Sequence, residues 1–384
     1  MAGIYLHIPF CRKACHYCNF HFSTSLNAQN DLVVALVQEI NLRKHYLQGQ
    51  TIRTIYFGGG TPSLLHQDEL RKILDALYKH FTIEQDAEIT LEANPDDLKP
   101  DNLQFWKAAG INRLSVGVQS FFEEDLIWMN RSHSAEQARE SMNLIRHAGF
   151  DNYSMDLIFG YPLLDMPKWQ KNMAWMIEAG VPHISCYGLT IEPKTVFHHQ
   201  QMKGQWAGVD QDVQAVQYEM LMKTLTQQGY RHYEISNFAL PGREAIHNSQ
   251  YWKGDWYLGL GPSAHSFNGE SRQWNVSHNQ QYIRGIMKAE QVFDLEYLSE
   301  RDQINEFILT QLRMDTGIAL DWLQERLSEQ QWTNWQIKMK RLIEQEQIYL
   351  RDHRAILTPT GKLYADGIAA DFFLDENPDR TNDH

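Results

Sequence analysis

The sequence has few cysteines and little positive charge. Its 4 cysteines in 384 residues are too few, and too tightly grouped, for the disulfide framework of a small secreted domain. Lys and Arg number 35 against 48 for Asp and Glu, which gives a net charge of −13. Because a field of that sign repels phosphate backbones, nucleic acid is not an expected partner.

Long apolar runs are also missing. The apolar segment at 184–191 is far shorter than the ~20 residues that span a bilayer, and the N-terminus lacks the apolar stretch of a secretory signal. We therefore expect a cytoplasmic protein without a transmembrane segment, with peripheral membrane contact left open. Cys186 lies within that apolar segment, so we expect it to be an inert buried thiol.

Short β-branched or aromatic runs alternate with longer helical patterns along the first half of the chain. Between two of these runs, Leu70, Ile73, Leu74 and Leu77 recur at the spacing of one helix face. The alternation predicts parallel βα units, and six units are fewer than the eight of a closed barrel, so we expect an open, partial barrel. The predicted strands are 4–8, 54–57, 88–92, 113–118, 153–159 and 183–189.

The second half of the chain differs in composition and in its predicted secondary structure. A helix is predicted from about 205 to 228, and a polar, Gly- and aromatic-rich stretch follows it as far as residue 274. Leu-, Gln- and Glu-rich helices come next, and then two short strands at 347–351 and 355–358, a pattern typical of a winged helix. Residues 301–384 carry 10 Lys and Arg against 15 Asp and Glu, so a scaffold role is favoured over DNA binding.

These patterns predict three units. They are an α/β barrel at 1–200, a connecting helical and aromatic region at 201–290, and a smaller C-terminal helical, winged-helix-like domain at 291–384. A parallel barrel carries its functional groups where its strands end, and we expect the site there. The polar or glycine residues at those ends are Gly58, Gly59, Gly60, Glu92, Gln119 and Asp156.

Three of the four cysteines lie within eight residues, directly after the first predicted strand: Cys11, Cys15 and Cys18. Clustered thiols in a reducing compartment point to metal or redox chemistry. Iron–sulfur cubes usually take four thiolates, so three would leave one iron open to a small molecule. The alternatives are three unrelated buried thiols, or a structural zinc completed by His7, His16 or His21.

Several motifs in this order resemble a known superfamily. Cys11-x3-Cys15-x2-Cys18 resembles the cluster motif of the radical S-adenosylmethionine (SAM) superfamily. Four further motifs resemble one branch of it, which contains the oxygen-independent coproporphyrinogen III oxidases and the HemW haem chaperones. These motifs are FGGGTPS at 57–63, LEANP at 91–95, SVGVQS at 115–120 and SMDLIFG at 154–160. The resemblance covers nearly the whole chain and implies a six-stranded radical-SAM (βα)6 partial barrel.

The resemblance also implies two cofactors. The three clustered cysteines would ligate a 4Fe–4S cluster whose fourth iron binds the amino and carboxylate groups of SAM. An electron from that cluster would split the sulfonium and leave methionine and a 5′-deoxyadenosyl radical. The residues that align with the SAM contacts of the branch are Tyr5, Gly59, Gly60, Thr61, Glu92, Gln119, Arg131 and Asp156.

These aligned residues suit such contacts chemically. The backbone of 59–61 can meet the methionine end of SAM, and Glu92 and Asp156 can accept hydrogen bonds from its ribose hydroxyls. Arg131 can form a charge-assisted bond with a carboxylate.

Three features distinguish the chain from the oxidases of this branch. Those oxidases resemble C-x3-C-x2-C-x-C, whereas Cys18 is followed by Asn19 and Phe20. They also carry a sizeable extension before the cluster, which here begins at residue 11. The stretch HNSQYW at 247–252 matches an H-N-x-x-Y-W motif associated with the chaperone group. Because imidazole is a good axial ligand for haem iron, His247 is the predicted haem-binding residue, with His265 as its competitor.

The sequence therefore predicts a haem chaperone that binds a 4Fe–4S cluster, SAM and haem. Its expected partner is a haem-accepting protein, such as a respiratory one, and whether SAM is cleaved stays open. The first alternative is a radical SAM oxidoreductase that acts on a tetrapyrrole, although coproporphyrinogen oxidase activity is not expected. The second is a tRNA- or nucleotide-modifying radical enzyme, which the net charge disfavours.

Overall fold

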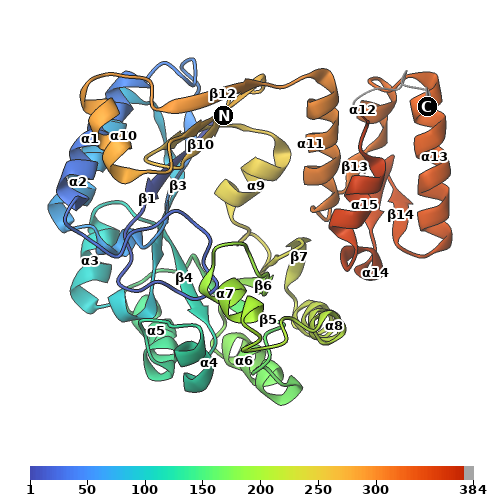
Figure 1. Ribbon diagram of the computed structural model, residues 1–384, viewed down its shortest axis with the longest axis horizontal. Coiled ribbons are helices and arrows are strands. Elements are labelled where there is room, and N and C mark those ends of the chain that lie inside the picture. Colours follow the sequence, from blue (N-terminus) through green and yellow to red (C-terminus); the bar gives the residue numbers. More distant parts are fainter. Residues whose placement is uncertain (376–384) are drawn as a thin grey trace.

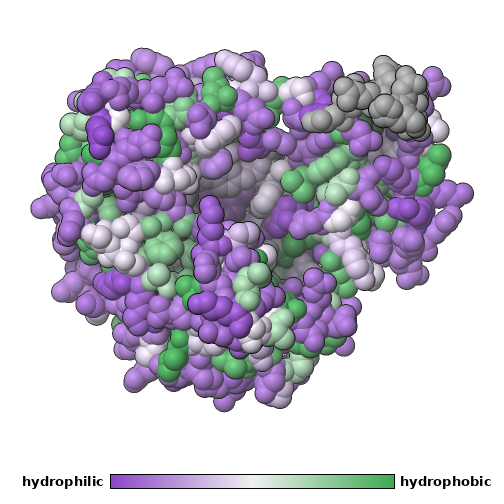
Figure 2. All heavy atoms as spheres, in the orientation of Figure 1, coloured by the Kyte–Doolittle hydropathy of each residue, from purple (hydrophilic) through white to green (hydrophobic). Residues whose placement is uncertain are grey.

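The structure, a computed structural model, describes residues 1–375 and has a larger and a smaller part (Figure 1). The larger part is built on a sheet of twelve strands and the smaller, C-terminal part on a sheet of three. Each part has an apolar core, and the core of the smaller part is formed by residues between Ile304 and Phe372. Figure 2 shows a mostly hydrophilic surface, with a hollow at the centre of this face.

Six parallel strands form the centre of the large sheet and pair in sequence order. Each predicted strand overlaps one of them, but the first two observed strands begin two residues earlier and the third five residues earlier, and the sixth ends one residue earlier. The strands are β1 (Ala2–Ile8), β2 (Ile52–Gly59), β3 (Ile83–Ala93), β4 (Arg113–Gln119), β5 (Tyr153–Phe159) and β6 (His183–Gly188).

Helices follow each of these strands and lie on the outside of the curved sheet (Figure 1). The predicted apolar stripe of the second helix, from Leu70 to Leu77, is buried in the core. The helices up to β6 are α1 (Gln29–Leu42), η1 (Pro62–Leu64), α2 (Gln67–His80), η2 (Pro95–Asp97), α3 (Pro100–Ala108), α4 (Glu123–Trp128), α5 (Ala135–His147) and α6 (Met166–Glu178).

The sheet continues on both sides of the six strands. Beside β1 lies a seventh parallel strand, β9 (Trp256–Leu260), which the sequence did not predict. Three antiparallel strands continue the sheet beyond β9: β10 (His265–Phe267), β11 (Ser271–Asn275) and β12 (Phe293–Tyr297). Beside β6 lie β8 (Asn237–Ala239) and β7 (Arg231–Glu234). Within residues 1–375 the outermost strands β12 and β7 do not pair, which confirms the open barrel.

The central strands alternate between two kinds of side chain. One set, which includes Ile4, Leu6 and Leu91, belongs to the large apolar core. Because successive side chains of a strand point to opposite faces, the set between them faces the inside of the barrel. This inner set is polar, unlike the branched apolar filling of common closed barrels. It includes Thr54, Tyr56, Glu88, Thr90, Glu92, Arg113, Ser115, Ser154 and Asp156.

The segment after β6 is more regular than the sequence indicated. The helix predicted from 205 begins later, because the Asp210 side chain accepts hydrogen bonds from the backbone N–H groups of Asp212 and Val213 and so caps its start. The Gly- and aromatic-rich stretch contains strands as well as one helix. The helices of this segment are α7 (Val196–Met202), α8 (Gln211–Gln227), α9 (Ile246–Lys253) and α10 (Asn279–Met287).

The C-terminal domain packs helices around a small sheet. Two of its strands, β14 (Ile348–Arg351) and β15 (Arg354–Leu357), lie where the wing was predicted, and β13 (Ile318–Ala319) pairs with β15. None of the helices in the described chain combines the length and apolarity that a membrane crossing requires. The helices are α11 (Glu300–Leu312), α12 (Leu320–Gln324), α13 (Glu329–Glu344), α14 (Pro359–Lys362) and α15 (Ala365–Phe372).

Candidate cofactor site

A cavity of about 380 Å³ lies where the central parallel strands end. Its volume is within the range of pockets that hold small molecules. The structure brings together at this cavity all of the predicted site residues except Gly58, Tyr5 and His247. Those that line it are Cys11, Cys15, Cys18, Gly59, Gly60, Thr61, Glu92, Gln119, Arg131 and Asp156.

The cysteine loop follows β1 directly and is held by backbone hydrogen bonds. Cys11 N donates to Ser23 O at 3.0 Å, and Cys18 N donates to Cys15 O at 3.2 Å. All three thiols are partly exposed, and burial raises the pKa of Cys11 and raises that of Cys18 to about 11. Since metal ligands are thiolates, binding of a metal centre here would release protons.

The histidines predicted to complete a zinc site contact other groups. Within residues 1–375, no three His, Cys, Asp or Glu side chains are placed to hold a single metal ion. His7 Nε2 donates to His21 O at 2.9 Å, His16 Nδ1 donates to Trp128 O at 2.8 Å, and His21 Nε2 lies 2.7 Å from Asn279 Oδ1. The three thiols instead face one cavity, as ligands of a larger centre would.

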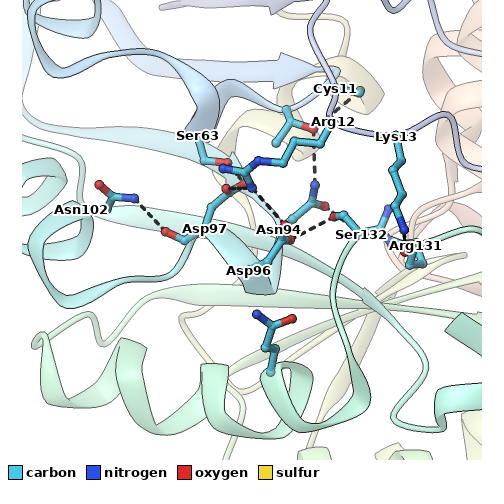
Figure 3. Close-up of polar contacts among 12 residues, drawn as sticks. Cys11, Arg12, Lys13, Ser63, Asn94, Asp96, Asp97, Asn102, Arg131 and Ser132 are labelled. Carbon is cyan, nitrogen blue, oxygen red and sulfur yellow. Dashed lines mark hydrogen bonds and ion pairs between the residues drawn. The ribbon is translucent and has the colours of Figure 1, made fainter. Parts of the chain in front are cut away.

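Two acidic residues that follow β3 form ion pairs with the cysteine loop, a feature that the sequence did not reveal. Figure 3 shows Arg12 directed toward Asp96 and Asp97. Arg12 Nη1 lies 2.9 Å from Asp96 Oδ2 and also donates to Asp97, whose other oxygen accepts from Ser63 at 2.7 Å. Ser132 donates to Asp96 at 3.0 Å, so the carboxylates tie the loop to two other segments.

Arg131, which lines the cavity, also links the cysteine loop to neighbouring segments. Its Nη1 lies 3.3 Å from Cys15 Sγ and 3.2 Å from Tyr17 Oη, and its Nη2 donates to Asn94 Oδ1 and Gly117 O, both at 2.6 Å. Although burial lowers its pKa, the neighbouring Tyr17 and Cys15 raise the pKa of Arg131 overall. Asn94 also lines the cavity, and the LEANP motif contained it without marking it as a site residue.

Two half-buried carboxyl groups line the cavity from β3 and β5. Glu92 Oε1 accepts from the Tyr56 hydroxyl at 2.8 Å, and Oε2 accepts from Gly59 N at 3.1 Å. Burial raises the pKa of Glu92 to about 7 and that of Asp156 to about 6. Among the described residues, Asp156 Oδ1 has no hydrogen-bond partner. These groups can therefore accept hydrogen bonds from a ligand with hydroxyl groups.

Backbone geometry at the cavity requires special residues. Gly59 has φ +107°, and a Cβ there would lie 2.6 Å from the His7 ring. A Cβ on Gly60 would lie 2.8 Å from the backbone of Phe10. Gln119 adopts φ +69° at the end of β4, a left-handed conformation that is uncommon for a residue with a side chain. Such conformations cluster at ligand sites.

Two of the remaining predicted residues, Tyr5 and His247, do not line this cavity. The Tyr5 hydroxyl is hydrogen-bonded with His7 Nδ1 at 3.1 Å. His247, on α9, is 2% exposed, and both of its ring nitrogens have partners at hydrogen-bond distance. An iron ligand needs a free nitrogen lone pair, so this arrangement does not present His247 to haem. His265, on β10, is exposed.

Comparisons with known proteins agree along nearly the whole chain. The sequence profile of the Radical SAM superfamily matches residues 5–176, and that of the HemN C-terminal domain matches residues 298–364. The Heme chaperone HemW of Bacillus subtilis is 34% identical over 97% of this chain and 99% of its own length. The Heme chaperone HemW of Escherichia coli is 36% identical over 68% of this chain and 69% of its own length.

A solved structure shares the fold. Coproporphyrinogen III oxidase (HemN) from Escherichia coli superposes with a TM-score of 0.81 over 97% of this chain and 90% of that chain. The two sequences are 24% identical, so this likeness establishes a common architecture and not a common activity.

Proposed function

Because this chain belongs to the radical SAM superfamily and, within it, to the HemW family of heme chaperones, we propose that it binds haem and delivers it to an acceptor protein. The observation that carries the proposal is the match with relatives of that name over 97% of the chain. The match includes both the barrel and the C-terminal domain. The net charge of −13 stays unfavourable to a nucleic-acid substrate.

We propose that the cavity is the cofactor site of this function. Family membership implies a 4Fe–4S cluster and SAM, and Cys11, Cys15 and Cys18 are the thiols that would hold the cluster. When bound, such a cluster supplies one-electron chemistry at an iron that a small molecule can chelate. Arg12 and Arg131 keep the loop in place through their contacts with the ends of β3 and β4.

The remaining cavity residues would orient SAM. The Glu92 and Asp156 carboxylates would accept hydrogen bonds from its ribose hydroxyls. In support, both residues line the cavity, and Asp156 Oδ1 has no hydrogen-bond partner in the described chain. The tight turn at Gly59 and Gly60 lets the backbone approach the ligand closely. Gln119 projects from its left-handed backbone at the same edge.

The residue at position 20 supports a chaperone over an oxidase. Phe20 stands where the resembling oxidases have a fourth cysteine; it is 67% exposed and lines the cavity. An exposed aromatic ring at the mouth of a cavity suits contact with a flat apolar molecule. Of the two histidines predicted for haem iron, only His265 is exposed, so we take it as the first candidate for the axial ligand.

One experiment separates the chaperone from a tetrapyrrole oxidoreductase. Anaerobically reconstituted protein would be given haem, and in a separate sample coproporphyrinogen III with SAM and a reductant. We expect a Soret band of bound haem, transfer of that haem to a haem-free cytochrome, and no decarboxylated product. Decarboxylation without stable haem binding would replace the proposal with the oxidoreductase.

A further inference from the structure

Helix α9 packs against the N-terminal halves of the central strands, whereas the cysteine loop lies at their C-terminal ends. The Glu88 carboxylate accepts hydrogen bonds from the backbone N–H groups of Ile246 at 3.1 Å and His247 at 2.9 Å. A Cβ on Gly3 would lie 2.8 Å from Thr54 Oγ1 and 2.9 Å from Gln250 Oε1. The side chains of α9 therefore have fixed positions against β1 and β2.

The imidazole of His247 is held on every side. Its Nδ1 lies 2.7 Å from Thr54 Oγ1 and its Nε2 lies 2.8 Å from Tyr251 Oη. The ring stacks on that of Tyr56, with centroids 4.9 Å apart and an angle of 21° between the planes. Burial also lowers its pKa to about 3, so the ring is neutral at physiological pH.

Tyr56 connects this packing to the cavity. Its ring is 7% exposed and contacts His247, while its hydroxyl donates to Glu92 Oε1 at 2.8 Å. Glu92 lines the cavity. The position of the Glu92 carboxylate thus depends on the Tyr56 ring, and the position of that ring depends on His247.

We propose that His247 is a positioning residue of the cofactor site: it fixes the Tyr56 ring, whose hydroxyl directs Glu92 toward the ribose of SAM. This inference rests on the proposed function, in which Glu92 contacts SAM. It assigns packing roles to the H-N-x-x-Y-W stretch. Tyr251 holds the His247 ring, and the Trp252 carbonyl accepts from Gln311 Nε2 of the C-terminal domain at 2.7 Å.

The test measures the dissociation constant of SAM on the full-length protein with a reconstituted cluster. His247→Ala should weaken SAM binding about tenfold, and Tyr56→Phe should do the same. In each variant the Glu92 carboxylate is no longer held in position for its charged hydrogen bond with SAM. The double variant should be no weaker than about tenfold, since both changes remove the same interaction. His247→Phe keeps a ring against Tyr56 and should recover most of the affinity.

A matched control is His232→Ala. His232 is also buried and stacked, on Phe238 with centroids 4.0 Å apart, but it does not contact Tyr56. It should change SAM affinity less than about twofold. Haem titrations of the same variants should show an unchanged Soret band for His247→Ala.

Several results would overturn the proposal. One is unchanged SAM affinity in His247→Ala, above all with an altered haem spectrum, which would make His247 the iron ligand. Another is a loss in His247→Ala with none in Tyr56→Phe. If His247→Ala does not fold, the SAM affinities of His247→Phe and Tyr56→Phe test the proposal, and unchanged affinity in Tyr56→Phe would overturn it. Failure of the wild-type protein to bind SAM would instead reject the proposed function itself.

Discussion

The cysteine loop and helix α9 both carry a sequence signature, but their side chains face different surroundings. Cys11, Cys15 and Cys18 are partly exposed and face a common cavity. On α9, His247 is enclosed and its ring nitrogens lie against Thr54 and Tyr251. The difference teaches that a signature can mark residues that bind a ligand or residues that hold the binding residues in place.

The largest expected effect is on the loop. Cys15→Ser should retain less than about a tenth of the wild-type iron after reconstitution, because a hydroxyl is a poor substitute for a soft thiolate. The fold should persist, as checked by circular dichroism. Cys186 is fully buried in β6, and Cys186→Ala serves as the control. Loss of more than half of the iron in that control would contradict the assignment of the ligands.

Gly59→Ala should also damage the cavity. The change forces a side chain into φ +107° and against the His7 ring, which we expect to lower the free energy of unfolding by about 3 kcal/mol. Gly49 has φ +78° with no atom near its added Cβ, so Gly49→Ala isolates the cost of strain at about 1 kcal/mol. Urea unfolding measures the free energy of unfolding of both variants. Equal losses of that free energy would show that the contact with His7 adds no cost beyond backbone strain.

Gly3→Ala is the corresponding change beneath α9. The added methyl collides with Thr54 and Gln250, and such overpacking costs about 2 kcal/mol. We expect weaker SAM binding with unchanged iron content, as measured by calorimetry and an iron assay. Gly367→Ala, where a Cβ meets no atom, should leave both quantities unchanged. Iron loss in Gly3→Ala would show that the two regions are not separable.

The smallest effect is a pH dependence of SAM affinity. Burial raises the pKa of Glu92 to about 7, so this group is mostly ionised at pH 8 and mostly protonated at pH 6. Because the ionised form is the better acceptor for ribose hydroxyls, affinity should fall about tenfold between pH 8 and pH 6. Calorimetry on Glu92→Gln should give a flatter profile. An equally steep profile in the variant would assign the dependence to another group, with Asp156 the next candidate.

Local patterns were sufficient to predict much of the barrel. The six strands and the helices between them follow from hydrophobic periodicity, and the residues at the strand ends meet because parallel strands end at one edge. Strand β9 was missed because its parallel pairing with β1 joins residues about 250 positions apart, which a five-residue pattern does not encode. The unit boundaries at 200 and 290 stay a prediction.

The surroundings of single side chains were the least predictable feature. The neighbours of His247 are Thr54 and Tyr56, which are nearly two hundred residues away in the sequence. The Arg12 contacts with Asp96 and Asp97 join residues 84 and 85 positions apart. Such contacts depend on strand register and helix docking, and no spacing within either segment carries that information.

The central claim is that the three cysteines hold a cluster whose open iron faces the cavity. Electron paramagnetic resonance of the reduced, reconstituted protein tests it most directly, with spectra recorded before and after saturation with SAM. The account predicts a changed cluster spectrum when SAM binds, and the same change, at higher SAM concentration, in Tyr56→Phe. A cluster spectrum that does not respond while SAM is demonstrably bound would contradict the claim.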